Sequence, residues 1–161
     1  MHPAKLPKYL TQEELARFFK RIRSVRDRAL FAAHYGLRVD EATALTLDDL
    51  DLKNYRISVR RLKNGIGGEK PLWRHTARLL RTWIRARGPA PSPYLFTGRE
   101  GPLKKRWVQR LFERYAEQAG IRGRSVHCAD DRWLVGRGQR LRPHPPPALQ
   151  RLGRRIIAPA P

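Results

Sequence analysis

The chain has 161 residues, enough to bury the core of one domain. Its 35 lysines and arginines outnumber its 14 aspartates and glutamates, which gives a formal net charge of +21 and indicates a polyanionic partner. No apolar run approaches the ~18 residues of a membrane span, and the single cysteine, Cys128, excludes an internal disulfide and fits a reducing cytosol.

Three helices are predicted in the first third of the chain. The first begins with a capping box, Thr11-Gln12-Glu13-Glu14, in which the Thr hydroxyl and the Glu carboxylate each accept a backbone N–H. Its apolar residues recur at helical spacing: Leu15, Phe18, Phe19 and Ile22. The second covers residues 25–35 and is closed by Gly36, with a packing face of Ala29, Leu30, Ala32 and Ala33. A short third helix is expected over 39–44.

The period then changes to that of a strand. Residues 55–62 alternate loosely and contain β-branched side chains, which predicts a strand. The Asn-Gly and Gly-Gly pairs of residues 63–68 are turn signals, so residues 69–73 are expected to return as a second strand of a hairpin. Before this hairpin, Asp48, Asp49 and Asp51 are typical of a solvated loop rather than of a metal site, because the EF-hand spacing is wrong.

Two more helices are predicted downstream. Residues 76–86 form one, with Leu79, Leu80, Trp83 and Ile84 inward and arginines outward. Residues 103–119 form the other, with Gly120 at its end and an apolar stripe of Val108, Leu111, Phe112 and Tyr115. Its first turn carries Lys104, Lys105 and Arg106, which oppose the helix dipole, so another group, such as phosphates, is expected to compensate them.

The composition changes after Cys128. Residues 129–161 contain no lysine, little periodicity and many arginines, prolines and glycines. This composition predicts a basic tail that is disordered or poorly ordered.

The excess of positive charge has more than one explanation. A nucleic acid is the commonest polyanionic partner, and an anionic membrane surface is a less common one. A GC-rich genome would also enrich arginine, whose codons are GC-rich. The charge follows particular helices, which favours nucleic acid.

Arg38 is a charged residue among apolar neighbours at a turn. In a structural role it would pair with Asp40 or Glu41 and cap the carbonyls of the preceding helix. In a functional role it would be an anion clamp, because a guanidinium held by packed helices and a carboxylate is a preorganised fork for phosphate. Residue type alone favours the structural role.

Lys63 and His127 each have two interpretations. Lys63 lies at the predicted hairpin tip, where it is a solvated turn residue, a point charge on phosphate or a general acid. His127 is a proton donor or acceptor near pH 7, or a surface residue. The sequence has no zinc spacing, phosphate loop or nucleophile elbow, so we expect no metal and no cofactor.

Four blocks occur together in an order that resembles the catalytic domain of tyrosine recombinases, the phage integrase family. They cover about residues 9–128. They are the opening helix from Tyr9, the box Tyr35-Gly36-Leu37-Arg38-Val39-Asp40-Glu41-Ala42, the hairpin that carries Lys63, and the run from Leu95-Phe96 through Gly101-Pro102-Leu103 to Gly120-Ile121. The arginine box is the most specific of the four.

The resemblance implies a mainly α fold with a small antiparallel β-sheet (α+β), incomplete at its C-terminus. It implies that Arg38 grips the scissile phosphate, Glu41 orients Arg38, Lys63 protonates the leaving 5′ oxygen, and His127 stands where the family has its histidine. The implied partner is double-stranded DNA, and no membrane partner is expected. The implied location is the cytoplasm, in association with the nucleoid. We expect contacts from Lys104, Lys105, Arg106 and Arg110, and a monomer in solution that can assemble on DNA.

The chain departs from the family pattern after His127. Asp130 stands where the family has its second arginine, and no tyrosine follows Tyr115 to serve as nucleophile. A reading-frame change after Cys128 would produce this shift, and only Met1–Lys8 precede the first block, so we expect a partial catalytic domain over 9–128. The expected function is DNA binding without cleavage. The alternatives are a DNA-binding module that never cleaves and a pseudogene product without function.

Overall fold

The structure is a computed structural model that describes residues 10–34, 37–60 and 67–123. Within these ranges helices dominate and the strands are short. The helices are α1 (Gln12–Arg21), α2 (Val25–His34), α3 (Val39–Thr43), the 3₁₀ turn η1 (Leu47–Asp49), α4 (Arg74–Arg87) and α5 (Lys105–Gln118). The strands are β1 (Leu50–Asp51), β2 (Arg56–Val59), β3 (Gly68–Pro71), β4 (Thr97–Gly98) and β5 (Gly101–Pro102).

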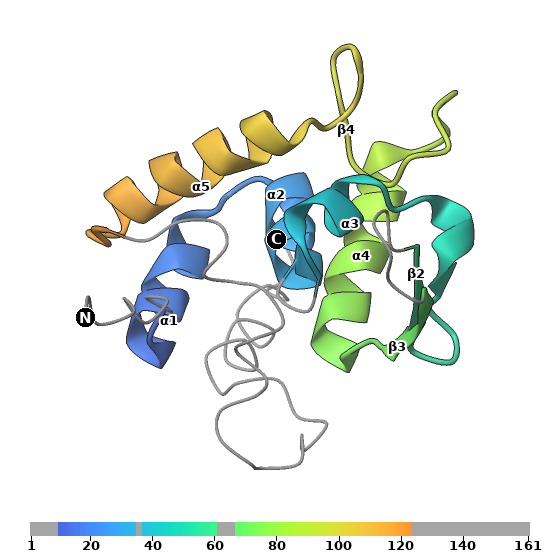
Figure 1. Ribbon diagram of the computed structural model, residues 1–161, viewed down its shortest axis with the longest axis horizontal. Coiled ribbons are helices and arrows are strands. Elements are labelled where there is room, and N and C mark those ends of the chain that lie inside the picture. The colour runs from blue at the N-terminus through green and yellow to red at the C-terminus, as the bar shows by residue number, and fades with distance from the viewer. Residues whose placement is uncertain (1–9, 35–36, 61–66, 124–161) are drawn as a thin grey trace, which may run out of the picture.

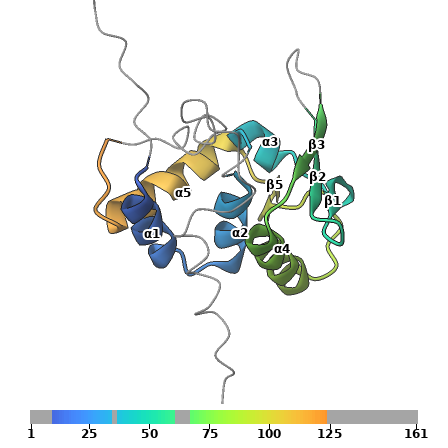
Figure 2. The same cartoon turned by 90° about the horizontal axis from the view of Figure 1, so that it is seen from below.

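The helices are arranged around α2. Figures 1 and 2 show α2 between α1 and α4, with the sheet that contains β2 and β3 on the far side of α4. Helix α5 lies across α1 and α2, and α3 lies near its N-terminal end (Figure 1). Helices α3 and α5 begin 66 positions apart in the sequence, at Val39 and Lys105. This arrangement brings their first turns to the same part of the molecule.

The core between α1, α2 and α5 is aromatic. Phe18 of α1 lies 5.1 Å from Phe31 of α2 and 5.0 Å from Phe112 of α5, measured between ring centroids. Tyr115 completes the cluster at 6.2 Å from both Phe18 and Phe31, with its ring edge-on to theirs. Edge-on aromatic pairs gain electrostatic energy in addition to apolar burial. Phe112 and Tyr115 are three residues apart in α5 and therefore lie on the same face of that helix. Phe18 belongs to the apolar stripe of α1, so each of the two helices presents one apolar stripe.

Helix α2 is buried on all sides from Ala29 to His34, rather than on one face. Seven of its ten residues are buried, among them Asp27, Phe31 and His34, which lie outside the predicted packing face of small residues. A helix buried all round is central to its domain. The sequence pattern therefore identified the helix but underestimated its burial.

The predicted hairpin is confirmed, in shorter strands. Strands β2 and β3 pair antiparallel, with Arg56 opposite Pro71 and Val59 opposite Gly68. A third strand that the sequence did not indicate, β1, pairs with the other edge of β2. Strands β4 and β5 form a separate antiparallel pair in the turn predicted over 98–102. The expected fold class, mainly helical with small antiparallel sheets, is correct.

The aspartates before β2 do not all lie in a solvated loop. Asp49 is buried, and its carboxylate accepts hydrogen bonds from the backbone N–H and the hydroxyl of Thr46, both at 2.8 Å. Arg60 pairs with its other oxygen at 3.5 Å. The prediction was wrong for this residue because Thr46 and Asp49 together begin η1.

The capping box of α1 is confirmed. The backbone N–H of Thr11 donates to Glu14 Oε2 at 2.8 Å, and the backbone N–H of Glu14 donates to the Thr11 hydroxyl at 3.1 Å. Gly120 ends α5 with a φ of 70°, a left-handed conformation that favours glycine. In the described part of the chain, every helix is too short or too polar to cross a bilayer.

Candidate nucleic-acid interface

Arg38 is the N-cap residue of α3. Its backbone is extended, with φ −69° and ψ 154°, and its carbonyl accepts the helical bond from Ala42 N at 2.9 Å. Leu37 and Val39 on either side are buried, whereas the Arg38 side chain is exposed. The guanidinium therefore extends from the surface while packed neighbours fix the backbone beneath it.

Glu41 contributes to that fixed backbone. Its side chain is 5% exposed, and its carboxylate accepts the backbone N–H of Arg38 at 2.9 Å. This is the carboxylate half of a capping box, which satisfies an N–H that the first turn of a helix otherwise leaves without a partner. The sequence predicted that Glu41 orients Arg38, and the bond shown here acts through the main chain.

The first turns of α3 and α5 are joined by an ion pair. Lys105 Nζ lies 3.1 Å from Asp40 Oδ2, and both side chains are about half exposed. The pair supplies a carboxylate to the cationic first turn of α5, where the sequence predicts a compensating group such as phosphate. Because the pair is exposed, we expect it to contribute at most ~1 kcal/mol to stability.

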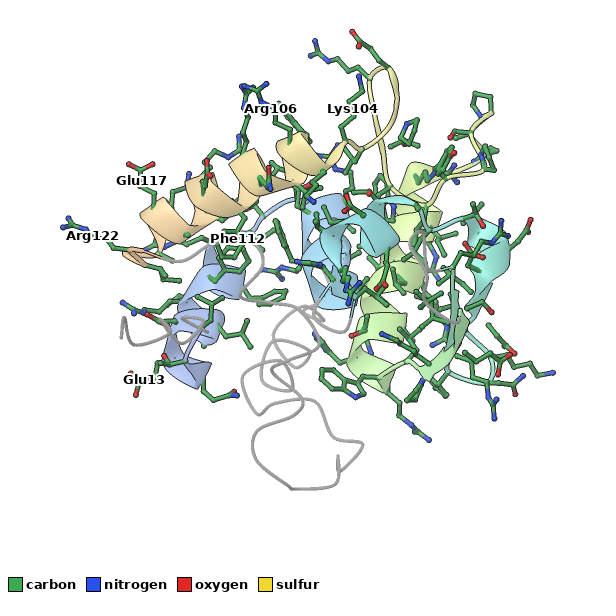
Figure 3. The ribbon with its side chains drawn as sticks, viewed as in Figure 1. Glu13, Lys104, Arg106, Phe112, Glu117 and Arg122 are labelled. Carbon is green, nitrogen blue, oxygen red and sulfur yellow. The ribbon has the colours of Figure 1, made fainter. Side chains whose placement is uncertain are left out.

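Three further cations of α5 are free to reach outward. Lys104 is the N-cap residue of α5, and it is exposed together with Arg106 and Arg110. Figure 3 shows Lys104 and Arg106 pointing away from the helical body, whereas Phe112 points inward. Trp107 lies among them with 46% of its surface exposed, a large exposed fraction for an indole. Basic side chains around an exposed aromatic ring are typical of nucleic-acid surfaces.

Two predicted site residues, Lys63 and His127, lie outside the described residues. Lys63 belongs to the segment that connects β2 with β3, whose last described pair is Val59 and Gly68. Within the described ranges, no three side chains of the metal-binding types lie close enough together to hold an ion.

A buried polar network that sequence analysis missed lies beneath α5. Asp27 is 2% exposed, and its Oδ2 accepts the hydroxyl of Tyr115 at 2.8 Å. Its Oδ1 accepts Arg26 Nε at 2.8 Å, and Arg26 also donates to the carbonyl of Thr97 at 3.2 Å. The network ties α2 to α5 and to β4. The partners are up to 88 residues apart in sequence, so no local pattern indicated them.

The tyrosines in the described ranges differ in their surroundings. Burial, followed by the hydrogen bond to Asp27 and that carboxylate's charge, raises the pKa of Tyr115. A hydroxyl with a raised pKa that already donates its proton to a carboxylate is a poor nucleophile. Tyr55 is half-buried beneath two guanidiniums, with Arg74 at 5.3 Å and Arg81 at 5.5 Å from its ring centroid. Tyr94 is half-buried in a β-bridge with Thr46.

His75 is a second buried titratable group that the sequence did not single out. It lies in the first turn of α4, and its Nε2 has no hydrogen-bond partner in the described part of the chain. Burial, followed by the charges of Arg78 and Arg28, lowers the pKa of His75. The lowered pKa favours the neutral form of this buried ring.

Comparisons with known proteins agree with this architecture. The model of the phage integrase family matches residues 8–144. The tyrosine recombinase XerC of Chromobacterium violaceum is 35% identical over 134 residues, which are 76% of this chain and 43% of that protein. The chain spans less than half the length of the curated relatives it matches.

Solved structures show the same fold. A crystal structure of XerA recombinase superposes with a TM-score of 0.71 at 21% identity, over 80% of this chain and 49% of that one. A lambda integrase dimer bound to a COC′ core site superposes with a TM-score of 0.64 at 17% identity, over 79% of this chain and 40% of that one. At these identities the likeness concerns the fold.

Proposed function

The chain belongs to the phage integrase family, and from that membership we propose that residues 1–161 bind duplex DNA and hold one of its phosphates on Arg38. The relatives named above are tyrosine recombinases, and the lambda integrase of the matched structure is bound to a core site. Members of this family break and rejoin DNA strands through a tyrosine. DNA is therefore the proposed partner, and a DNA phosphodiester is the proposed ligand of Arg38.

The observation that carries the proposal is the setting of Arg38. Buried Glu41 holds the main chain of Arg38, so binding has to order only the exposed side chain, whose planar fork matches two phosphate oxygens. The Asp40–Lys105 pair joins the first turn of α5 to α3. Beside this contact lie three exposed cations, the N-cap residue Lys104 and the α5 residues Arg106 and Arg110. Phosphate contacts of this kind position a protein on DNA and supply most of its sequence-independent affinity.

By resemblance to the family, each remaining site residue has a proposed role. Arg38 stabilises the charge that builds on the phosphate oxygens during transfer, since fixed positive donors are worth most where charge develops. Lys63 protonates the leaving 5′ oxygen, and His127 assists proton transfer or phosphate binding. Glu41 keeps Arg38 in position through its main chain.

We propose that residues 1–161 on their own do not cleave DNA. Asp130 takes the place of the family's second arginine, and a carboxylate repels the phosphate that the arginine would hold. No tyrosine follows Tyr115 in this sequence, and Tyr115 itself donates to buried Asp27. A reading-frame change after codon 128 would account for both departures, whereas the family model matches the chain as far as residue 144. Translation of the other frames past codon 128 tests this explanation. If none of them encodes an arginine near His127 and a later tyrosine, the explanation is refuted.

The rival functions are a non-enzymatic DNA-binding module or regulator that has kept the DNA-binding surface and lost the cleavage chemistry, and a pseudogene product without function. We propose that the protein is a monomer in solution, can assemble on DNA, and acts with the nucleoid in the cytoplasm. Assembly on DNA and action at the nucleoid depend on the proposed DNA-binding role, whereas the monomeric state is a separate proposal.

The test uses a labelled duplex that carries a single nick. We expect no detergent-resistant adduct with the wild type, and duplex binding that weakens roughly tenfold or more for Arg38→Ala, because a charge-assisted bond contributes about 1.5–3 kcal/mol. Arg38→Lys should restore only part of the loss, since a point charge does not reproduce a bidentate fork. The matched control is Arg85→Ala, an exposed arginine of α4.

Two results would contradict the proposal. A covalent protein–DNA adduct would show that the chain cleaves, and mapping it would identify the tyrosine. Equal affinities of the Arg38→Ala and Arg85→Ala variants would show that Arg38 holds no phosphate.

A further inference from the structure

A cavity of about 390 Å³ opens between the end of α1 and the last turns of α5. The side chains that line it are Lys20, Arg21, Arg23, Arg114, Tyr115 and Gln118. Four of the six are cations and none is a carboxylate. Cations gathered around one hollow repel one another, so an anion that enters is attracted by all four at once.

The fold itself does not need these cations as helix caps. Basic residues at the end of a helix often satisfy its last carbonyls. At the end of α1 Arg28 already does this, because its Nε donates to Ile22 O at 3.1 Å and its Nη2 donates to Phe19 O at 3.3 Å. Lys20, Arg21 and Arg23 are exposed, and their side chains are left available for a ligand.

Arg114 is held in place at the wall of the cavity. Its guanidinium lies 5.1 Å from the centroid of the Tyr115 ring, and the Tyr115 hydroxyl is bonded to buried Asp27. A guanidinium stacked on an anchored ring loses little freedom when it binds an anion. The network beneath α5 thus positions a surface arginine through Tyr115.

No carboxylate in the described ranges forms an ion pair with Lys20, Arg21, Arg23 or Arg114. The nearest carboxylate beneath the cavity, Asp27, is paired with Arg26. On α5, Glu117 lies one turn from Arg114, but it does not line the cavity and Figure 3 shows it pointing away from the helical body. The positive charge of the cavity is therefore not neutralised from within these ranges.

A row of exposed residues leads from the cavity along one face of α5. Trp107, Arg110, Arg114 and Gln118 are spaced by three, four and four residues, which places them on one side of the helix. Lys105, which pairs with Asp40 of α3, lies on the other flank. Figure 2 shows α3 at the N-terminal end of α5 and α1 beside its C-terminal half, so the cavity and Arg38 are separate sites.

We propose that this cavity is a second phosphate-binding site, which takes backbone phosphates of a bound polynucleotide at a distance from Arg38. The inference rests on the proposed DNA binding and deepens it. A polynucleotide suits the arrangement better than an acidic peptide, because guanidinium forks match phosphate oxygens and the row on α5 offers repeated charges and an exposed indole.

The experiment measures duplex affinity by fluorescence anisotropy across a salt series with the full chain. Two double variants alter the cavity: Arg23→Gln with Arg114→Gln, and Lys20→Gln with Arg21→Gln, which does not touch Tyr115. The matched control is Arg78→Gln with Arg85→Gln, two exposed arginines of α4. Melting temperatures establish that each variant is folded.

We expect each cavity variant to make the slope of log K against log salt shallower by about 1–2, at roughly 0.9 per phosphate lost. The control should leave the slope unchanged. The same decrement should appear in an Arg38→Ala background, because separate sites act additively.

Unchanged slopes in both cavity variants, with a clear Arg38→Ala effect, would overturn this inference and leave the proposed function standing. A wild-type slope near zero would overturn both. A second arm measures the rise in melting temperature with inorganic phosphate at constant ionic strength, and competition by poly-glutamate. The cavity variants could lose the response to phosphate or to poly-glutamate while their duplex slopes stay unchanged. That result would assign the cavity to small anions or an acidic peptide and would refute the proposal that it binds a polynucleotide.

Discussion

At the scale of single residues, two charged groups differ in their exposure to solvent. Arg38 has its neighbours in the core but extends its guanidinium to the surface, so its charge stays hydrated and available. Asp27 is enclosed, and it is compensated by the Tyr115 hydroxyl and by Arg26. An enclosed carboxylate without such partners would cost several kcal/mol. Arg38 is suited to a ligand, whereas Asp27 is suited to holding helices together.

The first residue-scale prediction concerns Tyr115. Tyr115→Phe keeps the ring in the aromatic cluster but removes the bond to Asp27, so the free energy of unfolding should fall by about 1–3 kcal/mol. Urea denaturation gives the value. The control is Tyr94→Phe, whose hydroxyl has no bond among the described residues and which should change stability by less than ~0.5 kcal/mol. Equal losses in the two variants would contradict a stabilising role for the Tyr115–Asp27 bond.

The second residue-scale prediction concerns pH. Because the pKa of His75 is lowered in the folded state, its contribution is fully present above the unfolded value near 6.5 and is lost as the pH falls below it. The wild type should therefore lose more stability than His75→Gln between pH 7.5 and pH 5.5. Urea midpoints at both pH values measure this. A loss of the same size in both proteins would show that His75 is not held neutral.

At the scale of elements, the contact between α3 and α5 joins the arginine box to the basic helix. Asp40 and Lys105 are both about half exposed, so their pairing contributes little to stability. Its larger effect is electrostatic, because Asp40 is a negative charge two residues from Arg38 and beside the first turn of α5. The pair thus tempers the positive potential where DNA is proposed to bind.

This gives a prediction for Asp40→Asn. The variant releases Lys105 and removes a charge that repels phosphate, so duplex binding should tighten a few-fold while stability changes by less than ~1 kcal/mol. Anisotropy at low salt and thermal melting measure the two effects. The control is Asp48→Asn, an exposed carboxylate in η1. Weaker binding by Asp40→Asn would show that the pair instead organises the site.

The elements also show what sequence could predict here. The helices α1, α4 and α5 were identified from one apolar stripe each, because a half-buried helix displays its period. Helix α2 shows less contrast, since residues on all its sides are buried, and its extent of burial was missed. Strand β1 has two residues, too few for any alternation to be seen.

The same reasoning applies to the candidate sites. Arg38 and Glu41 are three residues apart, so a local sequence pattern was sufficient to predict both as site residues. The cavity at α1 and α5 combines Arg23 with Arg114, whose proximity exists only after the chain has folded. The Asp27–Tyr115 bond was invisible for the same reason.

At the scale of the whole molecule, the fold separates its apolar interior from a strongly cationic exterior. The aromatic cluster of α1, α2 and α5 fixes the helices that carry the basic residues. With a net charge of +21, the molecule repels itself in the compact state, and a polyanion relieves that repulsion. We therefore expect the chain to be more stable in the presence of duplex DNA.

The central claim, that this chain binds DNA through phosphate contacts, is tested most directly by the salt dependence of wild-type duplex binding. Lys104, Arg106 and Arg110 together with Arg38 predict at least four contacts, so log K should fall against log salt with a slope of about −3.6 or steeper, at −0.9 per phosphate. The affinity should depend little on base sequence, because these contacts are to the backbone. A slope near zero would contradict the account.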